Sequence, residues 1–379
     1  FVSAGDDKKA VIWEVQYGRR IATLIGHSLP ITSLLLLPPV EENEEALIVT
    51  GSSDKQIRIW NSETGECLHV LTEHGASVKC LHLLHQGLFC AGGENLSLWN
   101  RKGQHFCTAQ DYINSMILVK NEYIVAAADV ELVCYEVSHD DDGKSHLLRI
   151  KQMHYHNEAV HSLVLISASA FASGSVDGMI LVWATSSLQP IRILHPVSAS
   201  EGDIKRFPHS VQSLMCLQER YLFAAVGCGF YVYDISNDKE TLVIQKKSAH
   251  LSKITAMGFA CEGELLATCS EDKCLRLWGH KQTLDPWKDG MAVTTMEKFA
   301  GLQSHELLQA AASSPWEPSL LGECCAHGGS VQGFLDFEYE GIVTCSSDGL
   351  VIIWKNSEMQ KVRRNQAVRK LLLNCDGIV

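Results

Sequence analysis

Histidine and aspartate side chains recur along the chain in pairs that could exchange protons, as in general acid–base catalysis. The pairs are His27 with Asp54, His156 with Asp177, His250 with Asp272, and His327 with Asp348. An active site needs one such pair, whereas a repeating structural unit needs one pair in each copy. We therefore interpret these residues as structural and expect no catalytic residue and no enzymatic activity in the chain.

Two short motifs resemble ligand-binding loops but lack essential residues. Gly143-Lys144-Ser145 matches the end of a phosphate-binding loop, yet Ser138 stands where that loop needs its first glycine. Asp140-Asp141-Asp142-Gly143 has neither the alternating acidic spacing nor the closing glutamate of a calcium loop. We predict a solvated turn here, without nucleotide or calcium.

The cysteines do not form a recognisable metal or disulfide pattern. The run Cys324-Cys325-Ala326-His327 suggests zinc, but adjacent cysteines chelate poorly and no second pair lies nearby in the sequence. The 14 cysteines are scattered, and several, such as Cys134 and Cys269, stand in apolar runs typical of strands. We predict buried free thiols, no metal, no cofactor and a reducing compartment.

The paired residues belong to a repeat that organises the chain. Each copy has a short apolar strand, small residues, an aspartate, and a second apolar strand that ends in an aromatic residue. The eight copies span residues 1–13, 48–60, 89–99, 124–135, 171–183, 223–233, 266–278 and 342–354. In six of them the aspartate precedes the aromatic residue by six positions, a coincidence that chance does not produce six times.

This repeat resembles that of the WD40 family, whose units of roughly 40–45 residues form four-stranded blades of a propeller. A histidine precedes the copies as in that family, at His27, His74, His156, His209, His250 and His327. The resemblance implies a buried hydrogen-bonded chain of histidine, hydroxyl, aspartate and tryptophan in four copies. The tryptophans are Trp60, Trp183, Trp278 and Trp354; the hydroxyls are Thr50, Ser173, Thr268 and Thr344, or in each case the serine two positions later.

Eight copies predict an all-β propeller of eight four-stranded blades over residues 1–356. The chain opens at Phe1 inside a copy, so we expect the first blade to lack its inner strand. The copies at 89–99 and 223–233 lack the aspartate, and no tryptophan is followed by aspartate. We expect these blades to be degenerate but present, because their strand pattern survives.

Three insertions interrupt the repeat, at residues 38–45, 138–145 and 279–319. The first two are acidic and are predicted to be hairpin loops. The third is longer than ordinary loops, and Met296, Phe299 and Ala300 form a helical stripe within it. It is either a flexible loop or a motif that binds a partner.

The tail at residues 357–379 differs from the acidic remainder of the chain. Basic and apolar residues alternate at helical spacing over residues 360–374, which predicts a short amphipathic helix. This helix either packs on the propeller edge or contacts a partner. The candidate partner-binding residues are Arg363, Arg364, Val368, Arg369, Leu371 and Leu372.

The net charge of −12 and the pI of about 5.8 argue against a general nucleic-acid surface, which needs clustered lysine and arginine. No run of residues approaches the roughly 18 apolar positions of a membrane helix. We predict protein partners, no nucleic acid and no direct insertion into a membrane.

Less generic stretches are similar to one subfamily of WD40 proteins. They are residues 77–81, 97–101, 223–227, 231–233, 270–272, 341–346 and 352–356. The resemblance implies a non-catalytic scaffold in a complex with two DENN-domain proteins, which acts on small GTPases, autophagy and lysosomal function. It further implies a cytoplasmic protein that is recruited to the lysosomal surface, where a lysosomal membrane protein is a possible partner.

Two other functions of WD40 proteins are alternatives. Substrate receptors of cullin-type ubiquitin ligases often carry Trp-Asp-x-Arg at blade ends, but here Asn61-Ser62-Glu63 follows Trp60. Propellers that bind phosphoinositides carry Phe-Arg-Arg-Gly, and the only comparable pair, Arg363-Arg364, lies in the tail. The ubiquitin-ligase receptor is the principal alternative.

Overall fold

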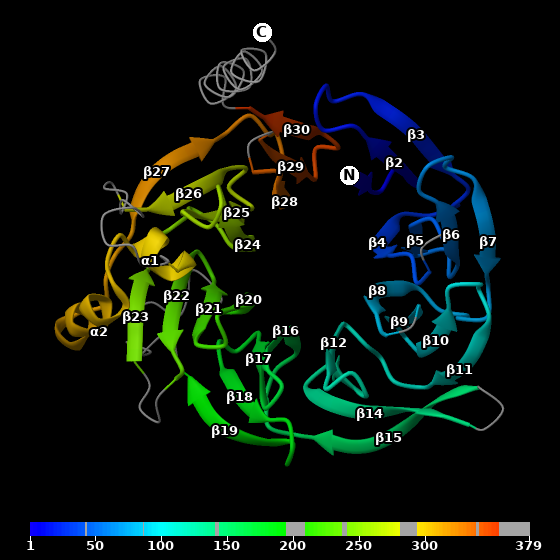
Figure 1. The fold of residues 1–379 in the computed structure, drawn as a ribbon, viewed down its shortest axis with the longest axis horizontal. Helices are drawn as coiled ribbons and strands as arrows, with labels where there is room; N and C mark the ends of the chain where they lie inside the picture. The colour runs from blue at the N-terminus through cyan, green and yellow to red at the C-terminus, as the bar shows by residue number, and fades with distance from the viewer. Residues whose placement is uncertain are drawn as a thin grey trace, which may run out of the picture. The chain divides into compact units, whose positions relative to one another are not determined.

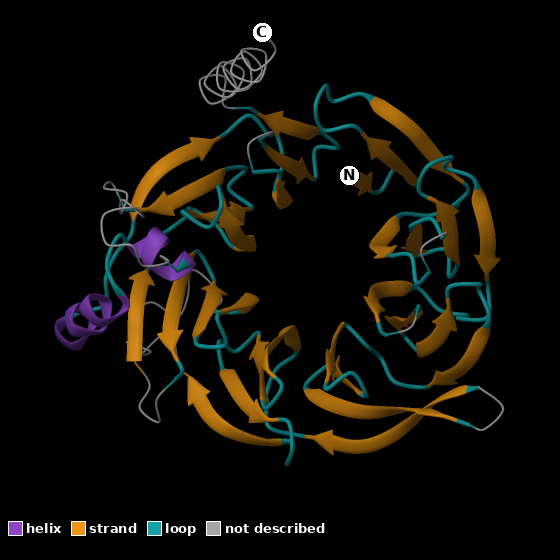
Figure 2. Ribbon diagram, viewed as in Figure 1, coloured by secondary structure: helices purple, strands orange, loops and turns teal. Residues whose placement is uncertain are grey.

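The computed structural model describes residues 1–41, 44–85, 87–140, 144–194, 209–236, 241–280, 294–338 and 341–355. Within these ranges the chain folds into thirty strands in eight antiparallel sheets and two helices. Figure 2 shows that strands dominate the structure. The sheets are the blades that the repeat predicts, so the all-β, eight-bladed propeller class is confirmed.

The chain divides into two compact units. The first unit holds residues 1–14, 20–254 and 307–317, and contains six sheets (Figure 1). Its strands are β1 (Val2–Ala4), β2 (Lys9–Trp13) and β3 (Arg20–Ile25); β4 (Ile31–Leu37), β5 (Leu47–Ser52), β6 (Ile57–Asn61) and β7 (Cys67–Leu71); β8 (Val78–Leu83), β9 (Leu88–Gly93), β10 (Leu96–Asn100) and β11 (His105–Ala109); β12 (Ser115–Val119), β13 (Tyr123–Ala128), β14 (Glu131–His139) and β15 (Ser145–Met153); β16 (Val160–Ser167), β17 (Ala170–Ser175), β18 (Ile180–Ala184) and β19 (Gln189–Leu194); β20 (Val211–Leu217), β21 (Tyr221–Val226), β22 (Gly229–Asp234) and β23 (Thr241–Lys246).

The second unit holds residues 15–19 and 255–306 and the described chain from Pro318 onward. It contains the sheet of β24 (Ile254–Ala260), β25 (Leu265–Ser270), β26 (Leu275–Gly279) and β27 (Ser319–Cys324). It also contains the sheet of β28 (Val331–Asp336), β29 (Ile342–Ser346) and β30 (Val351–Trp354). Two helices, α1 (Thr295–Ala300) and α2 (Ser304–Ser313), lie between β26 and β27 in the chain. The sheets β1–β3 and β28–β30 have three strands each within the described residues, and the other six have four.

The middle strands of several blades are buried on both faces. Every residue of β5, β9, β21 and β22 is buried, whereas the outermost strand β19 alternates between exposed and covered positions. A strand that is covered on both faces needs a continuous apolar run, and a strand that is covered on one face needs alternation. The repeat is therefore visible in the sequence chiefly through its middle strands.

The hydrophobic cores lie between consecutive sheets. Val49 and Ile59 of one sheet pack in a single cluster with Val78, Phe89 and Trp99 of the next. Phe171 and Trp183 likewise join a cluster with residues of the preceding sheet, with their rings stacked at 5.8 Å between centroids. Each blade thus stabilises its neighbour, because a single sheet has no core of its own.

Two glycines permit the close approach of neighbouring sheets in the first unit. A Cβ added at Gly51 would lie 2.4 Å from Val78 Cγ1, and one at Gly174 would lie 2.4 Å from Val211 Cγ1. Val78 and Val211 begin the inner strands β8 and β20 of the following sheets. A glycine before the serine of the repeat thus allows the next inner strand to pack directly on the backbone.

The part of the 279–319 insertion that is described here is folded. Thr294 caps α1 through a capping box with Glu297. Met296, Phe299 and Ala300 are buried, so the predicted helical stripe is confirmed, and the ring of Phe299 meets that of Phe259 edge-on at 5.9 Å.

Further along the insertion, in the first unit, Trp316 extends the sheet of β20–β23. Its backbone N–H donates to Val243 O at 2.9 Å and its carbonyl accepts from Gln245 N at 3.0 Å, in a parallel bridge with Ile244. Residues 281–293 of the insertion lie outside the described residues, so the two alternatives for that segment stay predictions.

The described helices are too short and too polar to cross a membrane. The predicted basic helix, with its candidate residues from Arg363 to Leu372, lies outside the described residues. The predicted acidic loops are partly described. Arg101 holds the first of them by donating from Nη1 to Pro38 O at 2.7 Å and by pairing through Nε with Glu44 at 3.1 Å.

We predict that Gly51→Ala and Gly174→Ala each lower the free energy of unfolding by about 1–3 kcal/mol, because the added methyl group overpacks the contact between sheets. Gly5→Ala is the matched control, since no atom lies within 4 Å of a Cβ at that position. Urea denaturation of the three variants measures the effect. Equal stability of all three would show that the glycines do not set the spacing between sheets.

Candidate functional site

A chain of buried side chains runs through the sheet of β4–β7. The Trp60 indole Nε1 donates to Thr50 Oγ1 at 2.9 Å, and Thr50 Oγ1 lies 2.7 Å from His27 Nε2. His27 Nδ1 lies 2.9 Å from Asp54 Oδ2. An ionised carboxylate can only accept, so the neutral His27 ring donates from Nδ1 to Asp54, and its bare Nε2 then accepts from the Thr50 hydroxyl. The direction of every proton therefore follows from Asp54.

Asp54 is the last member of this chain, and its carboxylate also accepts hydrogen bonds from two backbone amides. Its carboxylate accepts from Ser28 N at 2.9 Å and from Gln56 N at 3.0 Å. Burial by itself would raise the pKa of this carboxyl, but the hydrogen bonds from Ser28, His27 and Gln56 outweigh burial and hold the pKa below its usual value. Burial lowers the pKa of His27 against the opposing hydrogen bond of Asp54, consistent with a neutral ring.

The sheet of β28–β30 in the second unit carries the same four-membered chain. Trp354 Nε1 donates to Thr344 Oγ1 at 2.8 Å, Thr344 Oγ1 lies 2.7 Å from His327 Nε2, and His327 Nδ1 lies 3.3 Å from Asp348 Oδ2. Hydrogen bonds from Leu350 N and Gly328 N contribute to lowering the pKa of Asp348 to about 2.

The sheet of β16–β19 has a shorter chain. Trp183 Nε1 donates to Ser173 Oγ at 2.8 Å, and Ser173 Oγ lies 2.7 Å from His156 Nε2. His156 Nδ1 has no hydrogen-bond partner, and the exposed Asp177 accepts instead from Met179 N at 2.8 Å. The sequence groups Asp177 with His156, but the structure does not join their side chains by a hydrogen bond.

The hydroxyl that accepts from the tryptophan stands ten residues before it where the repeat is regular. The pairs are Ser3 with Trp13, Thr50 with Trp60, Ser173 with Trp183, Thr268 with Trp278, and Thr344 with Trp354. The sequence offered two candidate hydroxyls in each copy, and the earlier one accepts the hydrogen bond of the tryptophan. Ser52, a later candidate, instead donates to Pro30 O at 2.8 Å.

His250 is buried in the first unit, and Asp272 belongs to the second, where its Oδ1 accepts from Cys274 N at 3.2 Å.

The third blade supplies the hydroxyl of its chain from a different position, a serine that sequence reasoning overlooked. Trp99 Nε1 donates to Ser97 Oγ at 2.7 Å, and Ser97 Oγ lies 2.7 Å from His74 Nδ1. Ser97 stands two residues before the tryptophan on the same strand. Burial lowers the pKa of His74 to about 4, and the same cause lowers the pKa of His156 to about 4.

The fourth and sixth blades use different polar contacts. The Tyr135 hydroxyl donates to Asp111 in the fourth. In the sixth, Arg220 donates from Nε at 3.0 Å and from Nη2 at 2.7 Å to the buried Asp234, which follows Tyr233 directly. An aspartate directly after the aromatic residue was the sequence signal for this ion pair.

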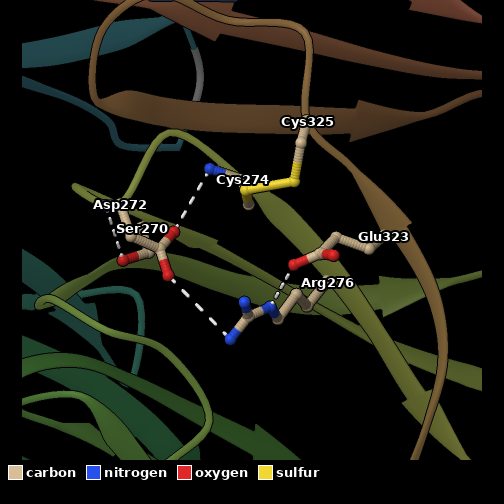
Figure 3. Close-up of a disulfide and its surroundings, with 6 residues drawn as sticks. All are labelled: Ser270, Asp272, Cys274, Arg276, Glu323 and Cys325. Carbon is tan, nitrogen blue, oxygen red and sulfur yellow. Dashed lines mark hydrogen bonds and ion pairs between the residues drawn. A yellow bond between two sulfur atoms is a disulfide. The ribbon is translucent and has the colours of Figure 1, made fainter.

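One pair of cysteines contradicts the prediction that all are free. Cys274 and Cys325 form a disulfide in the second unit (Figure 3). The other eleven described cysteines keep free thiols. Burial raises the pKa of the Cys80 thiol to about 12 and that of the Cys134 thiol to about 11, which makes them poor nucleophiles.

The same place holds the one group of possible metal ligands found among the described residues. A carboxylate oxygen of Glu323 and the sulfurs of Cys274 and Cys325 lie within 4.8 Å of one another. Sulfurs that are joined in a disulfide are not thiolates, and a thiolate is what a metal requires. His327, which the sequence places two residues after Cys325, is hydrogen-bonded within its own sheet.

The geometry of these chains defines the class of protein. Antiparallel blades that repeat along the chain, with a buried tryptophan, hydroxyl and histidine in series, are those of a WD40-type β-propeller. A family profile described as WDR41 matches residues 1–364, and the chain belongs to this WDR41 β-propeller family.

Comparison with known proteins agrees with this assignment. The chain is 30% identical to WD repeat-containing protein 41 of Homo sapiens over 404 residues, covering 99% of this chain and 87% of the human protein. The corresponding protein of Mus musculus is 29% identical over 407 residues, with 99% and 86% coverage. Among solved structures, the computationally designed Ika8 protein matches with a TM-score of 0.66 at 18% identity, over 94% of this chain and 92% of that one, which shows similarity of fold.

We predict that Asp54→Ala lowers the free energy of unfolding by about 1–3 kcal/mol, because it removes the acceptor of His27, Ser28 and Gln56 from a buried position. Asp177→Ala removes one turn acceptor at an exposed position and should cost less than about 1 kcal/mol. Chemical denaturation of both variants measures the difference. Equal costs would contradict the distinction between the complete and the shortened chain.

We predict that the protein loses stability as the pH falls from 6.5 towards 4. His74 and His156 have pKa values of about 4 when folded and 6.5 as the usual value, so the unfolded chain binds more protons in this window. The slope is on the order of 1.4 kcal/mol per pH unit for each such histidine. His156→Gln should flatten the slope, whereas His161→Gln at an exposed position should leave it unchanged. A slope that is unaffected by His156→Gln would refute the assignment.

Proposed function

We propose that this propeller is a non-catalytic scaffold subunit of a complex with two DENN-domain proteins. The complex regulates small GTPases, autophagy and lysosomal function, and the propeller helps to recruit it to lysosomes. The observation that carries the proposal is membership of the WDR41 family over residues 1–364. The identity of the partners rests on the resemblance of the chain to that family.

The recurring histidine and aspartate side chains form hydrogen bonds inside the protein, and this supports a scaffold rather than an enzyme. His27 and His327 each have both ring nitrogens engaged within their own sheets. Asp54 and Asp348 accept from backbone amides of turns. A general base needs a nitrogen or oxygen that can reach a substrate. Any chemistry on a GTPase would then belong to the partners.

Two segments are the proposed partner-binding surfaces. The first is the tail, with the candidate residues from Arg363 to Leu372, whose basic charge contrasts with a chain of net charge −12. The second is the insertion, where only Leu307 of α2 is buried and most of that helix faces outward. Charge complementarity gives association its rate and its specificity, so the tail suits an acidic partner surface.

The proposed role also implies where the protein is located in the cell. The protein would be cytoplasmic and would reach the lysosomal surface through a lysosomal membrane protein rather than by inserting into the bilayer. Eleven free thiols among the described cysteines fit a reducing compartment.

Affinity purification of the full-length protein from cells, followed by quantitative mass spectrometry, tests the proposal. We predict two DENN-domain proteins in amounts that match the propeller. A cullin adaptor recovered in their place, with no DENN-domain protein, would overturn the proposal in favour of a ubiquitin-ligase receptor.

We predict that combining Arg363→Glu with Arg364→Glu reduces recovery of the DENN-domain proteins at least tenfold, because reversed charge in an interface costs more than about 1.4 kcal/mol. The matched control combines Lys8→Glu with Lys9→Glu, which reverses two exposed charges at the start of β2. Both variants should melt at the temperature of the unmodified protein. Full recovery of partners with the tail variant would exclude the tail from the interface.

A further inference from the structure

The disulfide between Cys274 and Cys325 lies at one end of the pairing between β26 and β27, the third and fourth strands of their sheet. Leu275 of β26 pairs with Cys324 of β27, so Cys274 and Cys325 are the next opposed pair beyond the ladder. Their Cα atoms are 4.6 Å apart. This is the spacing of a non-hydrogen-bonded antiparallel pair, in which side chains approach most closely. The backbone therefore brings the two sulfurs together without help from the bond.

Other contacts hold the two strands whether or not the sulfurs are joined. Two residues along from the cysteines, Arg276 Nε donates to Glu323 Oε1 at 2.6 Å (Figure 3). Arg276 and Glu323 are opposed in the ladder, and the pairing continues to Gly279 and Ser319. A bond that is backed by several further strand pairs can open without separating the strands.

Solvent can reach this disulfide, which distinguishes it from the buried thiols of the chain. Cys325 is exposed and Cys274 is half-buried, whereas Cys90 and Cys269 are buried. Exchange begins when a thiolate from solution attacks one sulfur of the bond, so access to Cys325 determines whether the reaction occurs in the folded protein.

The bond joins the segment after the Asp272 turn to the segment just before His327, both in the second unit. Cys274 follows the turn of Asp272, and its N–H donates to that carboxylate at 3.2 Å. Cys325 stands two residues before His327, the histidine that binds Thr344 in the sheet of β28–β30. The sequence separation of 51 residues encloses β26, β27 and the whole insertion between them.

We propose that Cys274 and Cys325 form a reversible thiol–disulfide site that exchanges with dithiol reductants in the folded protein and that stabilises the second unit when oxidised. A reductant thiolate attacks Cys325 Sγ, the bond between the two protein sulfurs breaks, and Cys274 leaves as a thiolate that takes up a proton. The second thiol of the reductant then attacks the mixed disulfide and releases Cys325. The protein gains two thiols, and the reductant becomes its own disulfide.

Oxidation constrains the unfolded chain, because it closes a long loop, and so stabilises the second unit. Reduction removes this constraint and leaves the native pairing of β26 with β27 in place. The site is independent of the proposed scaffold role, since it requires only the geometry of one hairpin.

Native alkylation tests the proposal. The full chain is equilibrated with mixtures of reduced and oxidised dithiothreitol, treated with N-ethylmaleimide without denaturant, and mapped by peptide mass spectrometry. We expect Cys274 and Cys325 to become alkylated together as the mixture becomes more reducing, while Cys90 and Cys269 stay unmodified. Alkylation of the pair in fully oxidised mixtures would show that no bond forms, and labelling only after denaturation would show a permanent structural bond; either result overturns the proposal.

Thermal melting supplies the second measurement. The unmodified protein should melt several degrees higher in oxidised than in reduced dithiothreitol. Cys274→Ser should melt at one temperature in both buffers. Cys324→Ser, at the neighbouring residue, is the matched control and should keep the full difference; loss of the difference in that variant would mean that another pairing carries it.

Discussion

A buried hydroxyl shared between a tryptophan and a histidine is the interaction on which the sheets β4–β7, β16–β19 and β28–β30 depend. The indole N–H of Trp60 needs an acceptor inside the sheet, and the Thr50 hydroxyl lies between it and His27 in the hydrogen-bonded series. An unpaired indole or imidazole in such a place costs on the order of 1–3 kcal/mol. The hydroxyl therefore couples the second strand, the third strand and the loop that enters the blade.

The contacts between sheets impose the second constraint. Cores lie between blades rather than within them, so the middle strands must be apolar on both faces. Where the inner strand of the next blade touches the backbone, only glycine fits, as at Gly51 and Gly174. The same repeat thus satisfies hydrogen bonds inside a blade and packing between blades.

Sequence reasoning identified the contacts that follow the spacing of the repeat and missed those that depart from it. The six-residue step from Asp54 to Trp60 spans one turn and one strand, so it predicts both. The choice between Thr50 and Ser52 depends on which side chain points at the indole, and spacing alone could not decide it. The Cys274–Cys325 bond was missed because the insertion hides the pairing of β26 with β27. The role of Ser97 was missed because it lies on the strand of its own tryptophan.

These polar chains bear on function because they engage the histidine and aspartate side chains in hydrogen bonds within the protein. The residues that could exchange protons, above all His27 and Asp54, are hydrogen-bonded to one another and to Thr50, Ser28 and Gln56 within the first unit. The most direct test is Thr50→Val in the full chain, which keeps the shape of the side chain and removes its hydroxyl. The account predicts a loss of about 1–3 kcal/mol in unfolding free energy, with faster amide exchange at both Ser28 and Gln56. Unchanged stability and unchanged exchange would contradict the view that this hydroxyl holds the blade together.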